Sequence, residues 1–325
     1  MKEETELKTK YVRSVIKLGN SKAITFPQEW TNTAKLKEKS EVSLYPLDEK
    51  TIIIRAFDKE KPKTIFRMDT KIWPIMLIKS ALIAAFKLNI TEIYIKYSDE
   101  NQENLYKLLT DLRREIIGID FKNLDEQKEF LIYFLLDTSK TTFNQVLSDL
   151  IDVFNTIIKT VIEGTAKKNN ELLLAEIDRK FNLGRRILIT GLSEYPISRG
   201  SYRNLPIIRF LGDRVILIYV RDFINESLNL INFPPEVIRK YSELLKKIPS
   251  LLVGIVKNYD NINLQTISEL QKYLIKLGTM LENIKKGETF EDLELRNMIN
   301  YFLNSFQSFF DIGMTRLVES EVGMA

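Results

Sequence analysis

The pattern of hydrophobic and polar residues changes near residue 142, and this change divides the chain into two parts. From that point on, apolar residues recur at every third or fourth position, which is the spacing of helices with one buried face. The pattern is clearest at Phe143, Val146, Leu147, Leu150, Ile151, Phe154, Ile157, Ile158 and Val161.

This spacing predicts six helices. The first begins at Thr142 and ends at Gly164, because glycine readily takes the left-handed backbone that closes a helix. Pro234-Pro235 separates the six helices into two groups of three, since proline suits a first helical turn and interrupts a preceding helix. We therefore predict two three-helix bundles, residues 141–233 and 234–325, whose later helices span residues 169–192, 204–232, 235–257, 263–285 and 290–320.

Residues 1–57 have the pattern of short strands and turns. The run YVRSVIKLGNSKAITFP predicts two strands on either side of Gly19-Asn20, because both residues tolerate the positive φ of a hairpin turn. After Pro27 we expect a short helix and two more strands, over residues 28–37, 41–45 and 51–56.

A charged segment that contains proline, DKEKPK, predicts a linker over residues 58–66. Residues 67–140 then form a small α/β connecting segment. In it we expect helices over residues 73–88 and 101–115, and strands over residues 90–97 and 130–136. The fold class is therefore predicted to be α+β and multidomain.

The composition excludes several kinds of chemistry. The chain has no cysteine and no histidine, so it has no disulfide, no thiolate metal site and no histidine-based catalytic triad. It also has no phosphate loop, nucleophile motif or dinucleotide fingerprint. We expect no enzyme and no cofactor, although carboxylates, lysine or tyrosine could still serve an enzyme, and oxygen ligands could still hold a metal ion.

The sequence predicts a cytoplasmic protein that does not insert into a membrane. It has no run of about eighteen uncharged apolar residues, which a transmembrane helix would need. The first ten residues, MKEETELKTK, lack the apolar core of a signal peptide.

The net charge of +4 is concentrated near the N-terminus. Residues 1–66 hold 14 Lys/Arg and 10 Asp/Glu, and residues 7–40 hold 8 basic residues against 2 acidic ones. A local basic excess on a chain that is otherwise close to neutral favours a polyanion as partner. A solvated charged surface would give the same count.

The run VIKLGNSKAITFPQEW, residues 15–30, resembles the swapped-hairpin DNA-binding domain of the AbrB/MazE/SpoVT family. The downstream EVSLYPLDEKTIIIRAF fits the closing strand pair of that family, and the resemblance covers roughly residues 10–57. One departure is Lys39-Ser40, where the family commonly has Gly-Asp. The resemblance implies a β-barrel made by two interlaced chains, and hence a homodimer through the N-terminal domain that binds double-stranded DNA.

The candidate DNA-binding residues lie on and around the first hairpin. A short basic hairpin that a two-fold axis doubles would present a compact positive ridge to phosphates. Asn20 and Ser21 could reach base edges or sugars. In the alternative interpretation the barrel only dimerises and its lysines are solvated. The residues expected to contact phosphates are Lys10, Arg13, Lys17 and Lys22.

A second, longer stretch, roughly residues 70–320, resembles archaeal PhoU-type phosphate-uptake regulators. The runs LRREIIGIDF and FLIYFLLDTSKTTFNQVLSDLIDVF carry this resemblance. Such proteins often bind metal clusters through acidic pairs spaced four residues apart. In the first bundle the matching positions are occupied by Lys180, Gly184 and either Ile224 or Asn225. The second bundle offers only Glu269 and Asp311 at these positions. We therefore expect no helix to carry such an acidic pair and no metal to be bound.

Two further clusters have two interpretations each. Arg179, Arg185 and Arg186 could bind an anion, but a solvated helix face paired with nearby acidic residues is the simpler interpretation. The aromatic run YFLNSFQSFF, residues 301–310, is expected in the core, with a docking face as the alternative.

Together the two resemblances imply a dimeric transcriptional regulator whose helical part senses a signal or docks a partner, and the second resemblance connects it with phosphate uptake. The alternative is an adaptor for a phosphate-transport or signalling protein, in which the N-terminal barrel only dimerises.

Overall fold

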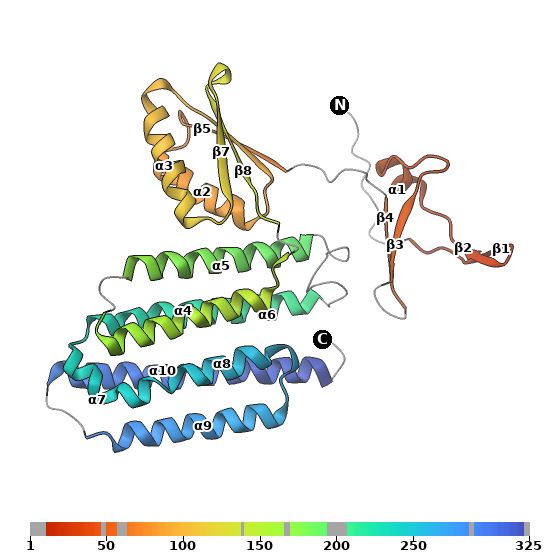
Figure 1. Cartoon of the computed structure of the whole chain (residues 1–325). Helices are drawn as coiled ribbons and strands as arrows, with labels where there is room; N and C mark the ends of the chain where they lie inside the picture. Colours follow the sequence, from red (N-terminus) through yellow and green to blue (C-terminus); the bar gives the residue numbers. More distant parts are fainter. Residues whose placement is uncertain are drawn as a thin grey trace. The chain divides into compact units, whose positions relative to one another are not determined.

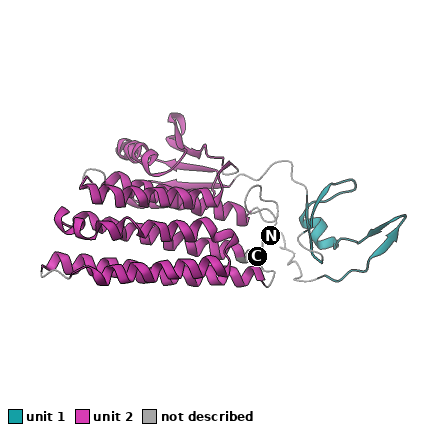
Figure 2. Cartoon of the chain, turned by 60° about the horizontal axis from the view of Figure 1, so that its bottom comes forward, with its two compact units in different colours: residues 1–62 teal, residues 63–325 magenta. Residues whose placement is uncertain are grey.

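The computed structural model describes residues 11–46, 50–56, 64–137, 140–165, 170–193, 207–285 and 289–321. The chain separates into two compact units, residues 1–62 and residues 63–325 (Figures 1 and 2). Strands and helices occur together in the chain, as the α+β prediction requires.

The N-terminal unit contains two small antiparallel hairpins and one short helix. The first hairpin pairs β1 with β2 and the second pairs β3 with β4. In the described residues of this single chain the hairpins form separate two-stranded sheets, not a closed barrel. The elements are β1 (Ile16–Leu18), β2 (Ser21–Ala23), α1 (Gln28–Thr33), β3 (Val42–Pro46) and β4 (Ile52–Ala56).

The helix predicted over residues 28–37 is shorter than expected. It ends at Thr33, and Lys35 has a φ of 53°. That left-handed backbone conformation cannot continue a right-handed helix, so the second half of the prediction is wrong.

The second unit begins with a four-stranded sheet in the order β5-β6-β8-β7. Strand β5 pairs with β6 in parallel, and the other pairs are antiparallel. Helices α2 and α3 contribute to one core with the sheet and both contact α5 (Figure 1). The elements are β5 (Ile65–Asp69), α2 (Ile75–Lys87), β6 (Glu92–Lys96), α3 (Gln102–Glu115), β7 (Ile119–Leu124) and β8 (Glu129–Phe134), with 3-10 turns at Asp99–Asn101 and Asp125–Gln127.

The predicted linker over residues 58–66 is too long at its C-terminal end. Strand β5 begins at Ile65, and Phe66 lies opposite Ile93 of β6. Residues 57–63 lie outside the described part of the chain. Strand β7 was not predicted either.

The rest of the chain is helical, and the six predicted helices are present with one correction. The helix predicted over residues 235–257 is two helices, because Pro249 has no N–H to donate to the carbonyl of the residue four positions earlier. The elements are α4 (Phe143–Glu163), α5 (Asn170–Ser193), α6 (Ile207–Ser227), α7 (Pro235–Leu245), α8 (Ile248–Asn258), α9 (Leu264–Asn283) and α10 (Phe290–Glu321), with 3-10 turns at Leu228–Asn232 and Tyr259–Asn261.

The two groups of helices share one hydrophobic core. Helix α4 packs on α7 and α8, and α6 packs on α10, so contacts cross the Pro234-Pro235 break. Buried Arg209 of α6 pairs with Asp213 of its own helix at 3.0 Å. It also pairs with Asp260 of the second group of helices, and this ion pair joins the two groups. None of the helices in the described part combines the length and hydrophobicity that a membrane span requires.

Candidate nucleic-acid interface

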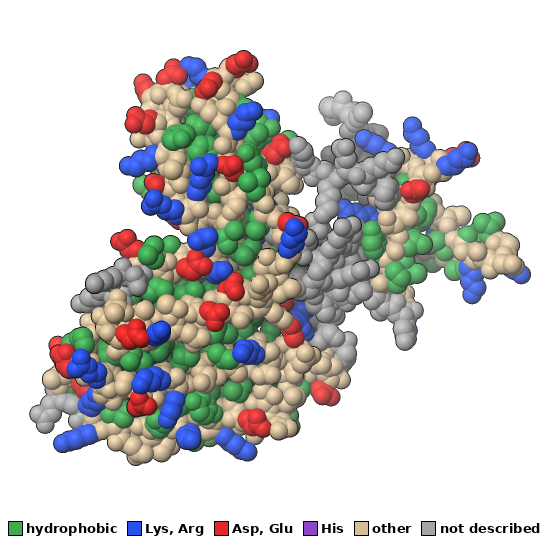
Figure 3. Space-filling model, in the orientation of Figure 1, with side chains coloured by type: hydrophobic (Ala, Val, Ile, Leu, Met, Phe, Trp, Pro, Cys, Tyr) green, Lys and Arg blue, Asp and Glu red, His purple; other side chains and the backbone are tan. Residues whose placement is uncertain are grey.

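The β1–β2 hairpin has two faces of opposite character. Successive side chains of a strand point to opposite sides. In the observed register Ile16 lies opposite Ala23, Lys17 opposite Lys22, and Leu18 opposite Ser21. One face therefore carries Ile16 and Leu18, and the other carries the two lysines. Apolar and basic side chains both lie on the surface of this hairpin (Figure 3).

The turn of this hairpin consists of Gly19 and Asn20, as the sequence predicts. Gly19 has a φ of 59°, whereas Asn20 is not among the residues with positive φ. A two-residue loop with positive φ at its first position is typical of a type II′ turn, which matches the twist of the flanking strands. This turn places Asn20 and Ser21 at the exposed tip of the hairpin.

Lys17 and Lys22 repel each other across the hairpin. They are directly opposite in the register, and like charges in that position destabilise a strand pair. Neither lysine has an ion-pair partner in the described residues. An anion bound on this face would remove the repulsion.

The other candidate residues are less well defined in this chain. The Arg13 side chain donates a hydrogen bond to the Val12 carbonyl at 3.2 Å, and its guanidinium lies 6.0 Å from the centre of the Tyr11 ring. Arg13 is exposed and precedes β1. Lys10 lies outside the described residues.

The N-terminal unit has no buried side chain among its described residues. Large apolar side chains are instead exposed, including Val12 at 77%, Leu18 at 67% and Leu44 at 58%. A groove of about 440 Å³ lies between Tyr11, Phe26, Trp30 and Ile54. In the described chain these apolar side chains and this groove are exposed to solvent and are not packed in a hydrophobic core.

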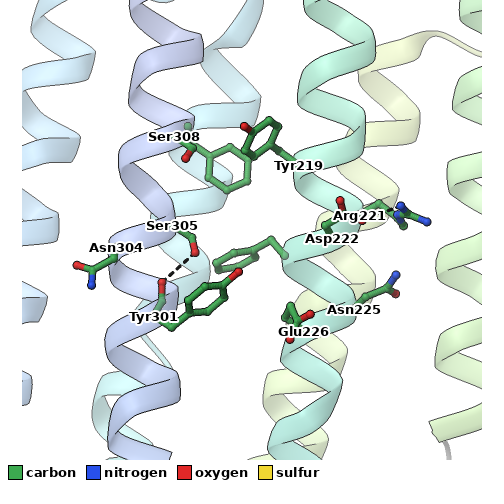
Figure 4. A pocket seen from close by; sticks show the side chains of 11 residues that line it. Tyr219, Arg221, Asp222, Asn225, Glu226, Tyr301, Asn304, Ser305 and Ser308 are labelled. Atoms are coloured by element: carbon green, nitrogen blue, oxygen red, sulfur yellow. Dashed lines mark hydrogen bonds and ion pairs between the residues drawn. The ribbon is translucent and has the colours of Figure 1, made fainter.

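The second unit has a groove of about 710 Å³ between α6 and α10 (Figure 4). Asp222 and Glu226 line it from α6, so one helix does carry carboxylates four residues apart, and the expectation that none would is wrong. Asp222 pairs with Arg221 at 2.7 Å, and α10 contributes uncharged Asn304 and Ser305. In the described residues no three carboxylates are arranged to hold a metal ion.

The arginine cluster on α5 is a partly exposed, acid-paired face at Arg179 but not at Arg186. Arg179 pairs with Glu176 at 3.1 Å, but Arg186 is only 5% exposed and donates to the Phe86 carbonyl at 2.7 Å. Its guanidinium also lies 4.8 Å from the centre of the Phe86 ring. Burial lowers the pKa of the Arg186 guanidinium from its usual range to about 10. The interpretation as a solvated face is therefore wrong for Arg186.

The aromatic run on α10 is mainly core, as expected. Its buried members, Phe302, Phe306, Phe309 and Phe310, belong to the shared helical core. Tyr301, at the start of the run, is 57% exposed and borders the groove in Figure 4.

Comparisons with protein-family models, with curated proteins and with solved structures find no match to this chain.

Proposed function

We propose that the protein is a DNA-binding transcriptional regulator that binds double-stranded DNA as a homodimer through its N-terminal hairpins. The observation that carries this proposal is the division of the β1–β2 hairpin into an apolar face and a lysine face. One face offers a surface for a second chain, and the other offers charge to a polyanion.

The lack of buried side chains in the described residues of the N-terminal unit supports the proposed dimer. A lone two-stranded hairpin is at best marginally stable in water, and this unit has two hairpins without a buried side chain in its described residues. Two interlaced copies would bury Leu18 and Leu44, which are exposed in the single chain. The same two-fold axis would place four hairpin lysines, two from each chain, on one surface.

The backbone at Lys39 also supports the swapped-hairpin arrangement. Lys39 has a φ of 64°, a conformation that favours glycine. This is the position at which the resembled family commonly carries glycine. The turn geometry of that family is therefore available to this chain despite the different residue.

In the proposed complex the lysines bind phosphates, and the hairpin tip lies near the bases. Lys17, Lys22 and Arg13 supply the sequence-independent part of the affinity. Asn20 and Ser21 carry donors and acceptors for base edges or sugars, and thus supply discrimination.

The helical unit would then sense a signal or dock a partner, and the second resemblance connects this role with phosphate uptake. The alternative is an adaptor of a transport or signalling system, in which the N-terminal unit dimerises and its lysines remain solvated. Both predict a dimer, so DNA binding distinguishes them.

Replacing both hairpin lysines tests the DNA interface. In a dimer, Lys17→Gln with Lys22→Gln removes about four phosphate contacts, so the slope of log affinity against log salt should become shallower by about 4. Fluorescence anisotropy with a labelled duplex measures this change.

The matched control is Lys272→Gln with Lys276→Gln, which removes the same charge from the exposed face of α9. We expect this variant to bind DNA like the parent chain. Equal affinity and equal salt dependence in both double variants would contradict the proposed interface and favour the adaptor.

A further inference from the structure

Three cationic side chains surround one phenyl ring in the second unit. The Phe181 ring of α5 has the Arg221 guanidinium 4.4 Å from its centre, the Arg185 guanidinium at 5.9 Å and the Lys87 ammonium at 6.0 Å. These residues come from α6, α5 and the last position of α2. Three separate elements thus bring positive charge to one point.

A fourth cation, Arg214, is exposed on α6. It precedes Arg221 by two helical turns on α6 and therefore shares its helix face. Burial lowers the pKa of Arg185, and the charges of Arg214 and Arg221 lower it further. Burial also lowers the pKa of Lys87, and the charge of Arg185 lowers it further. Lys87, Arg185 and Arg221 are therefore close enough to repel one another, and the charge of Arg214 also acts on Arg185.

Acidic neighbours compensate only part of this charge. Asp222 pairs with Arg221 at 2.7 Å, and Asp178 raises the pKa of Lys87 through its charge. In the described part of the second unit, Lys87, Arg185 and Arg214 have no ion pair. The three cations at the Phe181 ring therefore outnumber these two carboxylates.

Helix packing does not by itself explain the excess. Cations are favourable at a helix C-terminus, and at α2 this role is already filled by buried Arg186, which donates to the Phe86 carbonyl at 2.7 Å. Arg185 and Arg214 have no such role. The Nε atom of Arg221 is buried and lacks a hydrogen-bond acceptor in the described structure.

The geometry points to a binding site for a small multivalent phosphate-bearing anion, formed by Lys87, Arg185 and Arg221 around Phe181, with exposed Arg214 on the same face of α6 as Arg221. Guanidinium groups match phosphate oxygens with paired donors, and a compact group of cations favours concentrated negative charge. Phe181 is only 6% exposed, so it forms a closed floor and is not a stacking platform for a base. The site is independent of the proposed DNA interface and gives the helical unit a ligand of defined chemistry.

Isothermal titration calorimetry of the full chain with sodium pyrophosphate tests this site. Separate titrations with orthophosphate and ATP identify the source of the phosphate, and sulfate at matched ionic strength measures general anion binding. We expect one pyrophosphate per chain, bound at least about tenfold more tightly than sulfate, because each charge-assisted hydrogen bond contributes on the order of one tenfold step.

Two single variants assign the site. Arg185→Gln and Arg214→Gln should each weaken pyrophosphate binding by about tenfold, whereas Lys272→Gln on α9 should leave it unchanged. Without ligand, both arginine variants should unfold at the same temperature as the parent chain or at a higher one, because a repelling charge is removed. This second measurement separates loss of a ligand contact from loss of structure.

Equal affinity for pyrophosphate and sulfate, or unchanged pyrophosphate affinity in both arginine variants, would overturn the site. If Arg185→Gln weakened DNA binding but not pyrophosphate binding, the cluster would be part of a nucleic-acid surface. That outcome would also overturn the small-anion site.

Discussion

The neighbouring residues Arg185 and Arg186 show how far one position on a helix changes the role of a side chain. Arg186 is buried, bonded to a carbonyl and stacked on Phe86, whereas Arg185 is partly exposed among other cations. The sequence could not separate them, because the partner of Arg186 lies 100 positions away in the chain.

The hairpin tip depends on one glycine. Gly19 has a φ of 59°, and a Cβ there would meet no other atom within 4 Å, so alanine would strain only the backbone. That strain is about 1 kcal/mol for each chain. Because the strain occurs twice in the proposed dimer, we predict that Gly19→Ala weakens DNA binding by up to roughly 30-fold, and fluorescence anisotropy measures the change.

Gly164→Ala is the matched control for this prediction. Gly164 has a φ of 71° and equally open surroundings, but it ends α4 in the helical unit. This variant should lower the melting temperature of the helical unit and leave DNA affinity unchanged. A Gly19→Ala protein with the affinity of the parent chain would show that the turn does not position the DNA contacts.

At the scale of elements, the long helices were the most predictable part of the chain. Helix α4 was anticipated almost to the residue, since its buried face repeats over 21 residues and both ends are marked. Thr142 accepts a hydrogen bond from the Gln145 amide, and Gly164 takes the left-handed conformation that ends the helix.

The strands that were missed are the two edge strands of the four-stranded sheet. Strands β5 and β7 each pair with one neighbour, and β7 has the mixed sequence IDFKNL. An edge strand needs less hydrophobic sequence than a central one, so its periodic signal is weak.

The Gly19-Asn20 turn and its flanking strands were predictable because glycine marks the turn. The cation cluster at Phe181 could be predicted only in part from the sequence, because it combines residues from three elements that are far apart in the chain.

The apolar face of the first hairpin gives a prediction for the dimer. Leu18 is 67% exposed in the single chain, and burying a leucine side chain contributes roughly 1.5–3 kcal/mol. Because Leu18 occurs twice in the dimer, Leu18→Ser should weaken the dimer by about 100-fold or more. Analytical ultracentrifugation over a range of protein concentrations measures this change.

The same substitution at Leu264 is the control. Leu264 is 65% exposed at the start of α9, and its replacement should leave the dimer intact. If both leucine variants associated like the parent chain, the first hairpin would not be part of the interface between chains.

The whole molecule combines two units of different physical character. The helical unit has a continuous core that crosses the Pro234-Pro235 break. The described residues of the N-terminal unit contain no buried side chain and carry exposed apolar and basic groups. This contrast is what the proposed function expects, because a DNA-binding part that forms only by association would leave apolar groups exposed in a single chain.

Binding of the full chain to duplex DNA between about 50 mM and 200 mM salt tests this account most directly. About six phosphate contacts, from Arg13, Lys17 and Lys22 of two chains, predict an affinity that falls by about 1,000-fold over this range. Such a fall, with a stoichiometry of one dimer per site, is the predicted result. No binding at the lowest salt concentration, from a protein that is nevertheless dimeric, would contradict the DNA interface and leave the N-terminal unit as a dimerisation module.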